Sequence, residues 1–285
     1  MTIPIAESID EVRSRVAAWR REGLRVGFVP TMGALHAGHA SLVHAARRVD
    51  QRVVASVFVN PTQFGPNEDF TRYPRDLAGD ARTLEAAGCD LLFTTTPEAM
   101  YPPGYATWVT VEGLTERLCG AVRPGHFRGV TTVVTKLFAI VLPDDAFLGE
   151  KDRQQLLVLQ RMCADLNLPV RVHGCPIVRE PDGLAMSSRN AYLSPDERQR
   201  ALGLVRGLRR ARGAFAAGER DARALEALAR EEVARGAEPI DYVEAVDPGT
   251  LQPAARADER TILLIAARVG RTRLIDNHEL GRPGP

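Results

Sequence analysis

The sequence predicts an α/β protein with a Rossmann-like, doubly wound parallel sheet and a smaller α+β C-terminal domain. An apolar run at 26–29 leads through a glycine-containing loop into a helical pattern at 40–49, which is a strand–loop–helix unit. A nearly continuous apolar run at 53–59 follows, as expected of a strand that is covered on both faces. From Asp196 onward the composition changes to Ala, Arg, Leu and Glu, which indicates a second domain of a different class.

The composition is that of an ordinary globular protein and argues against several classes of function. The chain has 285 residues, 26% charged and 45% apolar, enough for one large and one smaller domain. Its 37 basic and 36 acidic side chains nearly balance, so we expect no nucleic-acid partner. No apolar run is long enough to cross a membrane, so no membrane partner is expected either. The four cysteines are scattered and no secretory leader is recognisable, which favours reduced thiols and a cytoplasmic location.

The larger domain is expected to span residues 1–180. Its first helix opens at Ser8, three residues before Glu11, which is the spacing of a capping box. After the strands at 26–29 and 53–59, the patterns predict a helix at 76–87, a strand at 91–93, a buried helix at 130–141, a strand ending at the Gly149 turn and a strand at 170–178. Right-handed crossovers would bring the ends of these parallel strands to one edge of the sheet.

The stretch 27–39, Gly-Phe-Val-Pro-Thr-Met-Gly-Ala-Leu-His-Ala-Gly-His, is the strongest candidate for a ligand site. Such a loop lets backbone approach a ligand, and the helix that follows presents unpaired N–H groups to an anion. His36 and His39 stand at the junction, where imidazoles can donate hydrogen bonds to phosphate oxygens. One histidine here would most simply be a surface residue. Two, with Gly38 between them and Gly33 before them, favour a nucleotide-phosphate site.

Three better-known motifs do not match this stretch. His39 stands where a P-loop requires lysine, no Glu lies between the two histidines as in a zinc protease, and Gly-x-Gly-x-x-Gly is absent. The His-x-Gly-His pattern that remains is the signature of adenylate-forming and nucleotidyl-transferring α/β enzymes. It resembles the phosphate-binding loop of class I aminoacyl-tRNA synthetases.

Polar residues also follow two other predicted strands. Asn60 and Gln63 come directly after 53–59, at the sheet edge expected to hold the histidines, and could hydrogen-bond a polar substrate. A plain Asn-Pro turn is the alternative. Lys151 follows the glycine turn at 149 and can place a charge on phosphate oxygens, with Gln155 one turn into the next helix.

Two further residues leave a structural and a functional alternative open. Asp80 could touch a metal-bound nucleotide, although an isolated Asp on a helix is more often solvated. His126, in the turn at 123–127, is as easily structural as functional.

The turn-rich stretch 179–183 marks the expected junction, so that residues 181–285 form the small domain. Ser187, Ser188 and Arg189 follow it and suit the oxygens of a triphosphate, with Arg189 offsetting charge on departing pyrophosphate. An ordinary linker before a helix capped at Ser194 is the alternative. Beyond it the patterns predict helices at about 195–217 and 221–235 and strands at 240–246, 261–269 and 272–275.

Taken in order, these motifs resemble the pantoate–β-alanine ligase family. The matching segments are Pro30–His39, Val57–Gly65, Tyr73–Arg75, Arg123–Phe127, Phe147–Asp152 with Gln154 and Gln155, and Asp182–Asn190. The C-terminal domain matches only in length and pattern. The resemblance implies ATP-dependent condensation of pantoate with β-alanine to pantothenate, with Mg²⁺ accompanying ATP. It also implies a cytoplasmic homodimer and a place in coenzyme A biosynthesis.

The resemblance assigns roles to individual residues. His39 is the implied proton donor and His36 its companion on the phosphates, while Lys151 and Arg189 supply positive charge. Gln63 and Gln155 are implied to hold pantoate, with Gln63 also near β-alanine, and Asn60 is a third substrate-binding candidate. The implied ATP contacts are Met32, Gly33, Ala34, Leu35, His36, Ala37, Gly38, His39, Gly149, Glu150, Lys151, Asp152, Val178, Met186, Ser187, Ser188 and Arg189. Because Gly79 precedes Asp80 where the family often has a second acidic residue, the metal ligands stay unassigned, with Asp80 a candidate.

The expected chemistry has two steps. Pantoate's carboxylate attacks the α-phosphorus of ATP and pyrophosphate leaves, and the amine of β-alanine then attacks the adenylate and releases AMP. The small domain is expected to close over the site and exclude water. One alternative is another nucleotidyltransferase of the same architecture, which would not need Gln63 and Gln155 together. A second is a nucleotide-sensing or tRNA-binding module, against which the balanced charge and the full set of phosphate-facing residues argue.

Overall fold

The structure, a computed structural model, describes residues 3–66 and 68–285. The chain divides into two compact units. The first holds Met1–Thr115, Arg123–Glu150 and Gln155–Pro176, and the second holds Glu116–Val122, Lys151–Gln154 and Ile177–Pro285.

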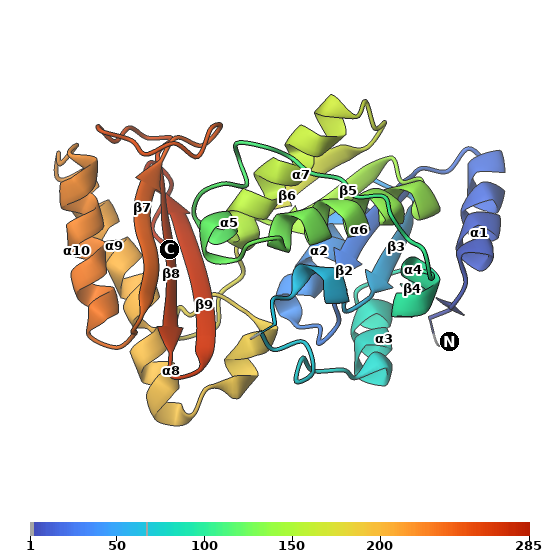
Figure 1. The fold of residues 1–285 in the computed structure, drawn as a ribbon, viewed down its shortest axis with the longest axis horizontal. Coiled ribbons are helices and arrows are strands. Elements are labelled where there is room, and N and C mark those ends of the chain that lie inside the picture. The colour runs from blue at the N-terminus through green and yellow to red at the C-terminus, as the bar shows by residue number, and fades with distance from the viewer. Residues whose placement is uncertain (1–2, 67) are drawn as a thin grey trace. The chain divides into compact units, whose positions relative to one another are not determined.

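A six-stranded parallel sheet forms the centre of the first unit (Figure 1). Its strands are β1 (Ile5–Ala6), β2 (Val26–Thr31), β3 (Arg52–Val57), β4 (Leu91–Thr94), β5 (Asp145–Gly149) and β6 (Arg171–Cys175). They lie in the order β1-β4-β3-β2-β5-β6, and every neighbouring pair is parallel. The Rossmann-like parallel sheet predicted from the sequence is therefore confirmed.

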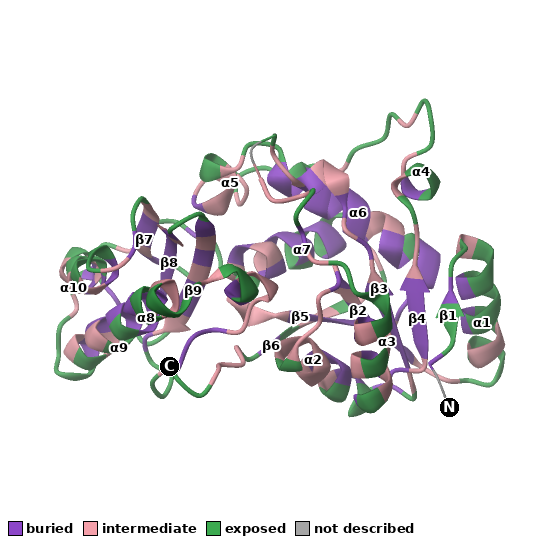
Figure 2. Cartoon of the chain, turned by 90° about the horizontal axis from the view of Figure 1, so that it is seen from below, coloured by how far each residue is buried: buried purple, intermediate pink, exposed green. Residues whose placement is uncertain are grey.

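Helices cover both faces of this sheet. They are α1 (Ile9–Arg21), α2 (Ala37–Arg47), α3 (Leu77–Ala86), α4 (Pro97–Met100), α6 (His126–Val141) and α7 (Arg153–Asp165), with a 3-10 turn, η1, at Pro61–Gln63. Neighbouring residues of β2 point to opposite faces. The ring of Phe28 meets Phe138 of α6 at a centroid distance of 6.2 Å, whereas Val29 packs with Leu42 and Val43 of α2. Strands β2 to β5 are largely buried, as Figure 2 shows for β4, whereas the outer side of α1 is exposed.

The strand order places the ligand-binding edge of the sheet. From β2 the chain proceeds outward through β3 and β4, and it then returns to add β5 and β6 on the other side of β2. The order therefore reverses between β2 and β5, and open parallel sheets bind ligands at the carboxyl ends of the strands at such a point. The segments that leave these ends begin at Met32 and Glu150, both within the predicted site.

The second unit is a small α+β domain, as predicted. Its antiparallel sheet has the order β7 (Ile240–Val246), β8 (Ile262–Val269) and β9 (Thr272–Glu279). The helical segments are α5 (Cys119–Val122), η3 (Ser188–Tyr192), α8 (Pro195–Ala201), α9 (Gly203–Ala216) and α10 (Ala222–Ala234). Its core includes Leu204 and Leu208 of α9, Leu225 of α10, and Leu263 and Ile265 of β8.

Several element boundaries differ from those predicted. Helix α2 begins at Ala37 rather than at residue 40, because His36 itself caps the helix. The single helix expected at about 195–217 is two helices that break at Leu202, directly before a glycine, a poor helix former. Strand β9 continues to Glu279, beyond the predicted end at 275, because its polar residues still pair with β8. The short elements β1, α4 and α5 carry too few residues for a periodic pattern.

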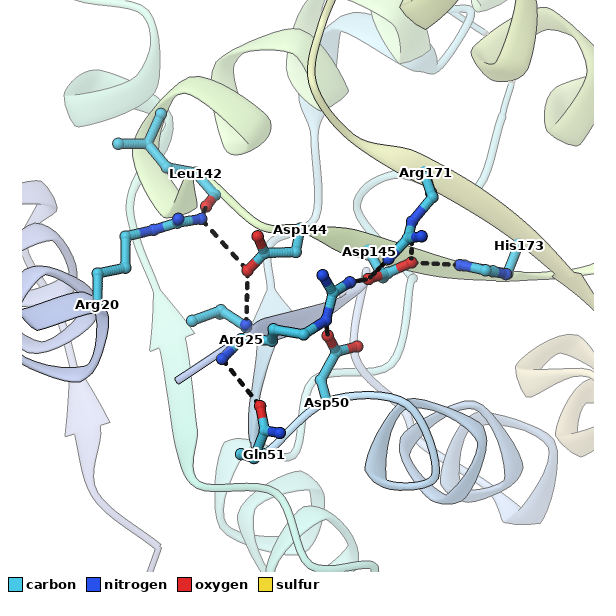
Figure 3. Close-up of polar contacts among 10 residues, drawn as sticks. Arg20, Arg25, Asp50, Gln51, Leu142, Asp144, Asp145, Arg171 and His173 are labelled. Carbon is cyan, nitrogen blue, oxygen red and sulfur yellow. Dashed lines mark hydrogen bonds and ion pairs between the residues drawn. The ribbon is translucent and has the colours of Figure 1, made fainter. Parts of the chain in front are cut away.

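A charged network lies at the opposite, amino-terminal edge of the parallel sheet (Figure 3). Asp145 opens β5 and pairs with Arg25, with Arg171 at 3.0 Å and with His173 at 2.5 Å. Asp50 precedes β3 and lies 3.5 Å from Nε of Arg25. Because this edge is remote from the carboxyl ends of the strands, we assign the network to stability rather than to ligand binding.

Asp50 makes the stability of the protein depend on pH. Its side chain is fully buried, and this burial, with the charge of Asp145 nearby, raises the pKa of Asp50 to about 6. Above pH 3.8, the ordinary pKa of an aspartate, the unfolded chain releases this proton while the folded protein keeps it until the pH reaches about 6. The folded state therefore loses stability as the pH rises from 3.8 through about 6.

Asp50→Asn is expected to remove this loss. The variant should be more stable than the wild type at pH 8, by on the order of 3 kcal/mol, since one pKa unit corresponds to about 1.4 kcal/mol. It should be nearly equal to the wild type at pH 4, where Asp50 is largely protonated in the folded state and little stability has been lost. Calorimetric melting at the two pH values measures the difference. An equal gain at both would show that the effect is not electrostatic.

Within the described part of the chain, no helix has the length and apolar character needed to cross a membrane.

Candidate active site

The loop from β2 to α2 has a fixed backbone. Gly33 and Ala34 both have positive φ, 88° and 52°, so the chain makes a tight left-handed turn that favours glycine at the first position. The Oγ1 atom of Thr31 donates to the carbonyl of Ser56 at 2.6 Å and accepts from the N–H of Gly33 at 3.2 Å. These bonds attach the loop to β3 and set its direction toward the helix.

The two histidines cap the N-terminus of α2. Nδ1 of His36 accepts from the N–H of Gly38 at 3.1 Å, and Nδ1 of His39 accepts from the N–H of His36 at 3.3 Å. A backbone N–H can only donate, so Nδ1 carries no proton in either ring and each neutral ring holds its proton on Nε2. The ring centroids are 4.1 Å apart. The junction thus supplies two Nε2–H donors beside the positive end of an 11-residue helix.

Asp80 on α3 accepts hydrogen bonds from the backbone of the loop between β2 and α2. Its carboxylate accepts from the N–H of Leu35 at 2.7 Å and from the N–H of Ala34 at 3.1 Å. A Cβ atom on Gly33 would lie 2.8 Å from Oδ2 of Asp80, so the loop and the carboxylate are closely packed. Burial raises the pKa of Asp80, while the two N–H donors act in the opposite direction.

The sequence left open whether Asp80 binds a metal, and the contacts of its carboxylate bear on this question. Both of its oxygens face backbone N–H groups of the loop. Among residues 3–66 and 68–285 no group of three or more His, Cys, Asp or Glu side chains could hold a metal ion. Mg²⁺ in ATP-dependent enzymes is commonly held by substrate phosphates with few protein ligands. The contacts of Asp80 therefore assign its carboxylate to holding the loop.

Asp80→Asn is expected to raise KM for ATP by about 10- to 100-fold, because one part-buried loop N–H would lose its acceptor at a cost of about 1–3 kcal/mol. Asp76→Asn on the same helix is the control, because Asp76 caps α3 and Asn caps equally well. Initial rates over a range of ATP at several fixed Mg²⁺ concentrations measure the effect. If excess Mg²⁺ restored KM, Asp80 would be a metal ligand and the loop-holding role would be wrong.

Asn60 and Gln63 lie on and beside η1, after the end of β3. Both are buried, with exposed fractions of 1% and 8%. Nε2 of Gln63 donates to Sδ of Met32 at 3.1 Å, which brings this predicted substrate-binding residue against the predicted ATP loop. Gln155 is half-buried in the first turn of α7.

Lys151 belongs to the second unit and is held there by backbone contacts. Its Nζ donates to the carbonyl of Met186 at 2.7 Å, and its own carbonyl accepts from Nδ2 of Asn277 at 3.0 Å. Burial lowers the pKa of Lys151 to about 8, although Asp152 and Asp276 oppose the shift. Lys151 is therefore a cation that can lose its charge in mildly alkaline solution.

The segment around Arg189 is tied to the same unit. Ser187 caps η3 by accepting from the N–H of Arg189 at 3.2 Å. The N–H of Met186 donates to the carbonyl of Val178 at 3.0 Å, which makes neighbours of two predicted ATP-contact segments. Asn190 donates to Glu180 at 2.7 Å.

The sequence did not reveal the residues that hold Lys151 and Asn60 in place. Asn277 holds the backbone of Lys151, and Asp276 beside it accepts from Arg179 at 2.7 and 3.0 Å. Six of the eight residues of β9 are polar or charged, so Asp276 and Asn277 did not stand out from their neighbours. Tyr101, whose hydroxyl donates to Oδ1 of Asn60 at 2.8 Å, gave no signal at all.

The parallel sheet and the histidine-capped loop together are typical of an α/β enzyme that binds a phosphate-bearing ligand at the carboxyl ends of its strands. Comparison with known proteins makes this specific. The model of the family "Pantoate-beta-alanine ligase" matches residues 4–279. The chain is 57% identical over 275 residues to a pantothenate synthetase of Syntrophotalea carbinolica, covering 96% of this chain and 97% of that protein.

Solved structures agree with this match. The pantothenate synthetase of Thermus thermophilus superposes with a TM-score of 0.92 at 50% identity, covering 98% of this chain and 99% of that one. A pantoate–β-alanine ligase of Francisella tularensis, complexed with beta-gamma ATP and β-alanine, gives a TM-score of 0.83 at 33% identity, covering 99% of both chains.

The chain belongs to the pantoate–β-alanine ligase family, and its activity is the joining of pantoate and β-alanine to form pantothenate. This identification decides against both alternatives raised from the sequence, another nucleotidyltransferase and a binding module without catalysis.

Proposed function

We propose that the reaction proceeds through a pantoyl adenylate and that the capped loop after β2 binds the phosphates during its formation. The observation that carries the proposal is the pair of Nε2–H donors fixed by the two Nδ1 acceptors of His36 and His39. Because the backbone already sets both tautomers, the two rings carry N–H groups at Nε2, the polarity that an anion requires.

In the first step a carboxylate oxygen of pantoate attacks the α-phosphorus of ATP. A new P–O bond forms, the bond from the α-phosphorus to the bridging oxygen breaks, and pyrophosphate leaves. His39 donates to the oxygen on which charge develops and His36 supports it. Lys151 and Arg189 supply positive charge to the phosphates, and Mg²⁺ enters with ATP.

In the second step the amine of β-alanine attacks the activated acyl carbon. The C–N bond forms, a proton leaves the amine, and AMP departs with the carboxylate oxygen that pantoate supplied. Gln63 and Gln155 hold pantoate, and orientation of the two reactants supplies much of the rate. The Francisella tularensis ligase complexed with beta-gamma ATP and β-alanine supports the choice of nucleotide and amine.

Oxygen tracing tests this route. Pantoate labelled with ¹⁸O in its carboxylate should transfer one ¹⁸O to AMP, and mass spectrometry detects it. Pantoate and Mg·ATP alone should release pyrophosphate in a burst, with steady AMP formation only after β-alanine is added. Label in inorganic phosphate and none in AMP would mean activation as an acyl phosphate, and the adenylate route would be wrong.

Three further expectations from the resemblance belong to this proposal. We expect a homodimer, which light scattering coupled to size exclusion measures, and a cytoplasmic location. We also expect residues 181–285 to close over the bound substrates as a separate domain. Unchanged hydrogen exchange in 182–190 on adding ATP and pantoate would count against closure.

A further inference from the structure

The neighbours of Asn60 determine which end of its side-chain amide is the oxygen and which is the nitrogen. Its Oδ1 accepts from the N–H of Thr62 at 3.3 Å, and its Nδ2 donates to the carbonyl of Gly129 at 3.2 Å. A backbone N–H can only donate and a carbonyl can only accept, so the amide cannot be flipped. The second Nδ2 hydrogen donates to Oε1 of Gln63 at 3.0 Å. Both donors of Asn60 are thus used within the protein, and the residue is 1% exposed.

The orientation of the Asn60 amide also fixes the orientation of the Gln63 amide. Since Oε1 of Gln63 accepts from Asn60, the other end of the amide is the Nε2 group, with two hydrogens. The contact of this group in the described part of the chain is Sδ of Met32, a weak acceptor. An oxygen of a ligand would be a better partner. The free end of the Gln63 amide is therefore its Nε2 donor group, and this end can bind a carboxylate oxygen but not an ammonium group.

A second set of contacts holds the backbone of Gln63. Its carbonyl oxygen lies 2.8 Å from Nδ1 of His126, whose Nε2 lies 3.0 Å from Nη1 of Arg123. The carbonyl can only accept and the guanidinium can only donate, so His126 is the neutral tautomer with its proton on Nδ1. Arg123 is itself held by Glu68, through two bonds of 2.6 and 2.5 Å.

Close packing of α6 fixes the distance between these groups. A Cβ atom on Gly129 would lie 2.4 Å from the carbonyl oxygen of Thr62 and 2.7 Å from the backbone N of Gln63. Only glycine lets the helix approach η1 so closely. His126 opens this helix and is 8% exposed, so it reaches Gln63 from inside the protein.

We propose that Asn60 and His126 are positioning residues that hold Gln63 with its amide nitrogen toward the carboxylate of the acid substrate. Asn60 fixes the direction of the Gln63 side-chain amide, and His126 fixes the position of the Gln63 backbone carbonyl. The carboxylate is the group concerned because Met32, which Gln63 touches, begins the loop that binds the phosphates, and the attacking oxygen must reach them. The proposal rests on the role of Gln63 in the proposed function, and it makes Asn60 a support for substrate binding instead of a contact.

Steady-state kinetics on matched isosteres tests the proposal. Asn60→Asp replaces the donor by an oxygen, so that the Gln63 amide must turn and present Oε1, and KM for pantoate should rise on the order of 100-fold. His126→Asn keeps a nitrogen near the position of Nδ1 and should change KM for pantoate less than about 3-fold. His126→Gln places its nitrogen near Nε2 instead and should raise KM about 10-fold. KM for ATP should change little in all three.

The controls separate the possible failures. Gln63→Ala must raise KM for pantoate; if it does not, the proposed role of Gln63 is wrong, whatever the other variants show. If Gln63→Ala raises KM but neither Asn60→Asp nor His126→Gln does, the positioning roles are wrong. A purely structural role would lower the melting temperatures and raise KM for both substrates together, with no difference between the two His126 variants. The His126 pair alone carries the test if Asn60→Asp does not fold.

Discussion

Replacing His39 by asparagine is expected to lower the rate of pantoate-dependent pyrophosphate release by about 100- to 1,000-fold, the usual effect of losing one preorganised donor to a developing charge. Asparagine has an oxygen near the position of Nδ1, so it can still accept from the N–H of His36, 3.3 Å away in the wild type. It has no group near Nε2. The change therefore removes the donor while keeping the cap, and it should act on kcat more than on KM for ATP.

Two variants control this result. His39→Gln places an amide nitrogen near Nε2 and should keep more activity than His39→Asn. His44→Ala removes a histidine from the exposed side of the same helix and should leave the rate unchanged. Rapid-quench measurement of a single turnover with pantoate and Mg·ATP gives the rate of the first step. A His39→Asn enzyme with nearly normal pyrophosphate release would exclude His39 as the donor.

The parallel sheet and its order of helices were predictable because buried strands and amphipathic helices leave strong periodic patterns. The run at 53–59 and the pattern at 40–49 are examples, and both correspond to elements of the structure. Boundaries were less predictable because they depend on caps. His36 accepts from the N–H of Gly38, and an imidazole in this role is not among the preferred capping residues.

The candidate site was predictable in its loops but not in its supports. His36, His39 and Lys151 stand next to glycine-containing turns that can be recognised along the chain. Asp80 and Asn277 act on segments 45 or more residues away, at Leu35 and Lys151. Only the fold creates such contacts, so no local pattern contains them.

Lys151 is one of two lysines in a chain with 37 basic residues, the other being Lys136. All remaining residues of that set are arginines, so an ammonium group at this position is unusual for the chain. The proposed function gives this ammonium group a specific role, which is binding phosphate oxygens. The compact Nζ donates to the carbonyl of Met186 at 2.7 Å and has further hydrogens that the proposed mechanism uses for phosphate oxygens, whereas the planar fork of arginine would need more space.

Lys151→Met is accordingly expected to lower kcat/KM for ATP by about 100-fold or more, because the proposed mechanism would lose one of its two side-chain cations for the phosphates. In the wild type kcat/KM for ATP should fall as the pH rises through about 8, since burial lowers the pKa of Lys151 to about 8 and the neutral amine carries no charge. Lys151→Arg should lose this pH dependence because arginine stays charged, although its absolute rate should be reduced.

Initial rates from about pH 6 to about pH 9.5 with each variant measure both effects. If Lys151→Met kept the same decline above about pH 8, another group would be responsible, and the charge of Lys151 would have no part in binding ATP.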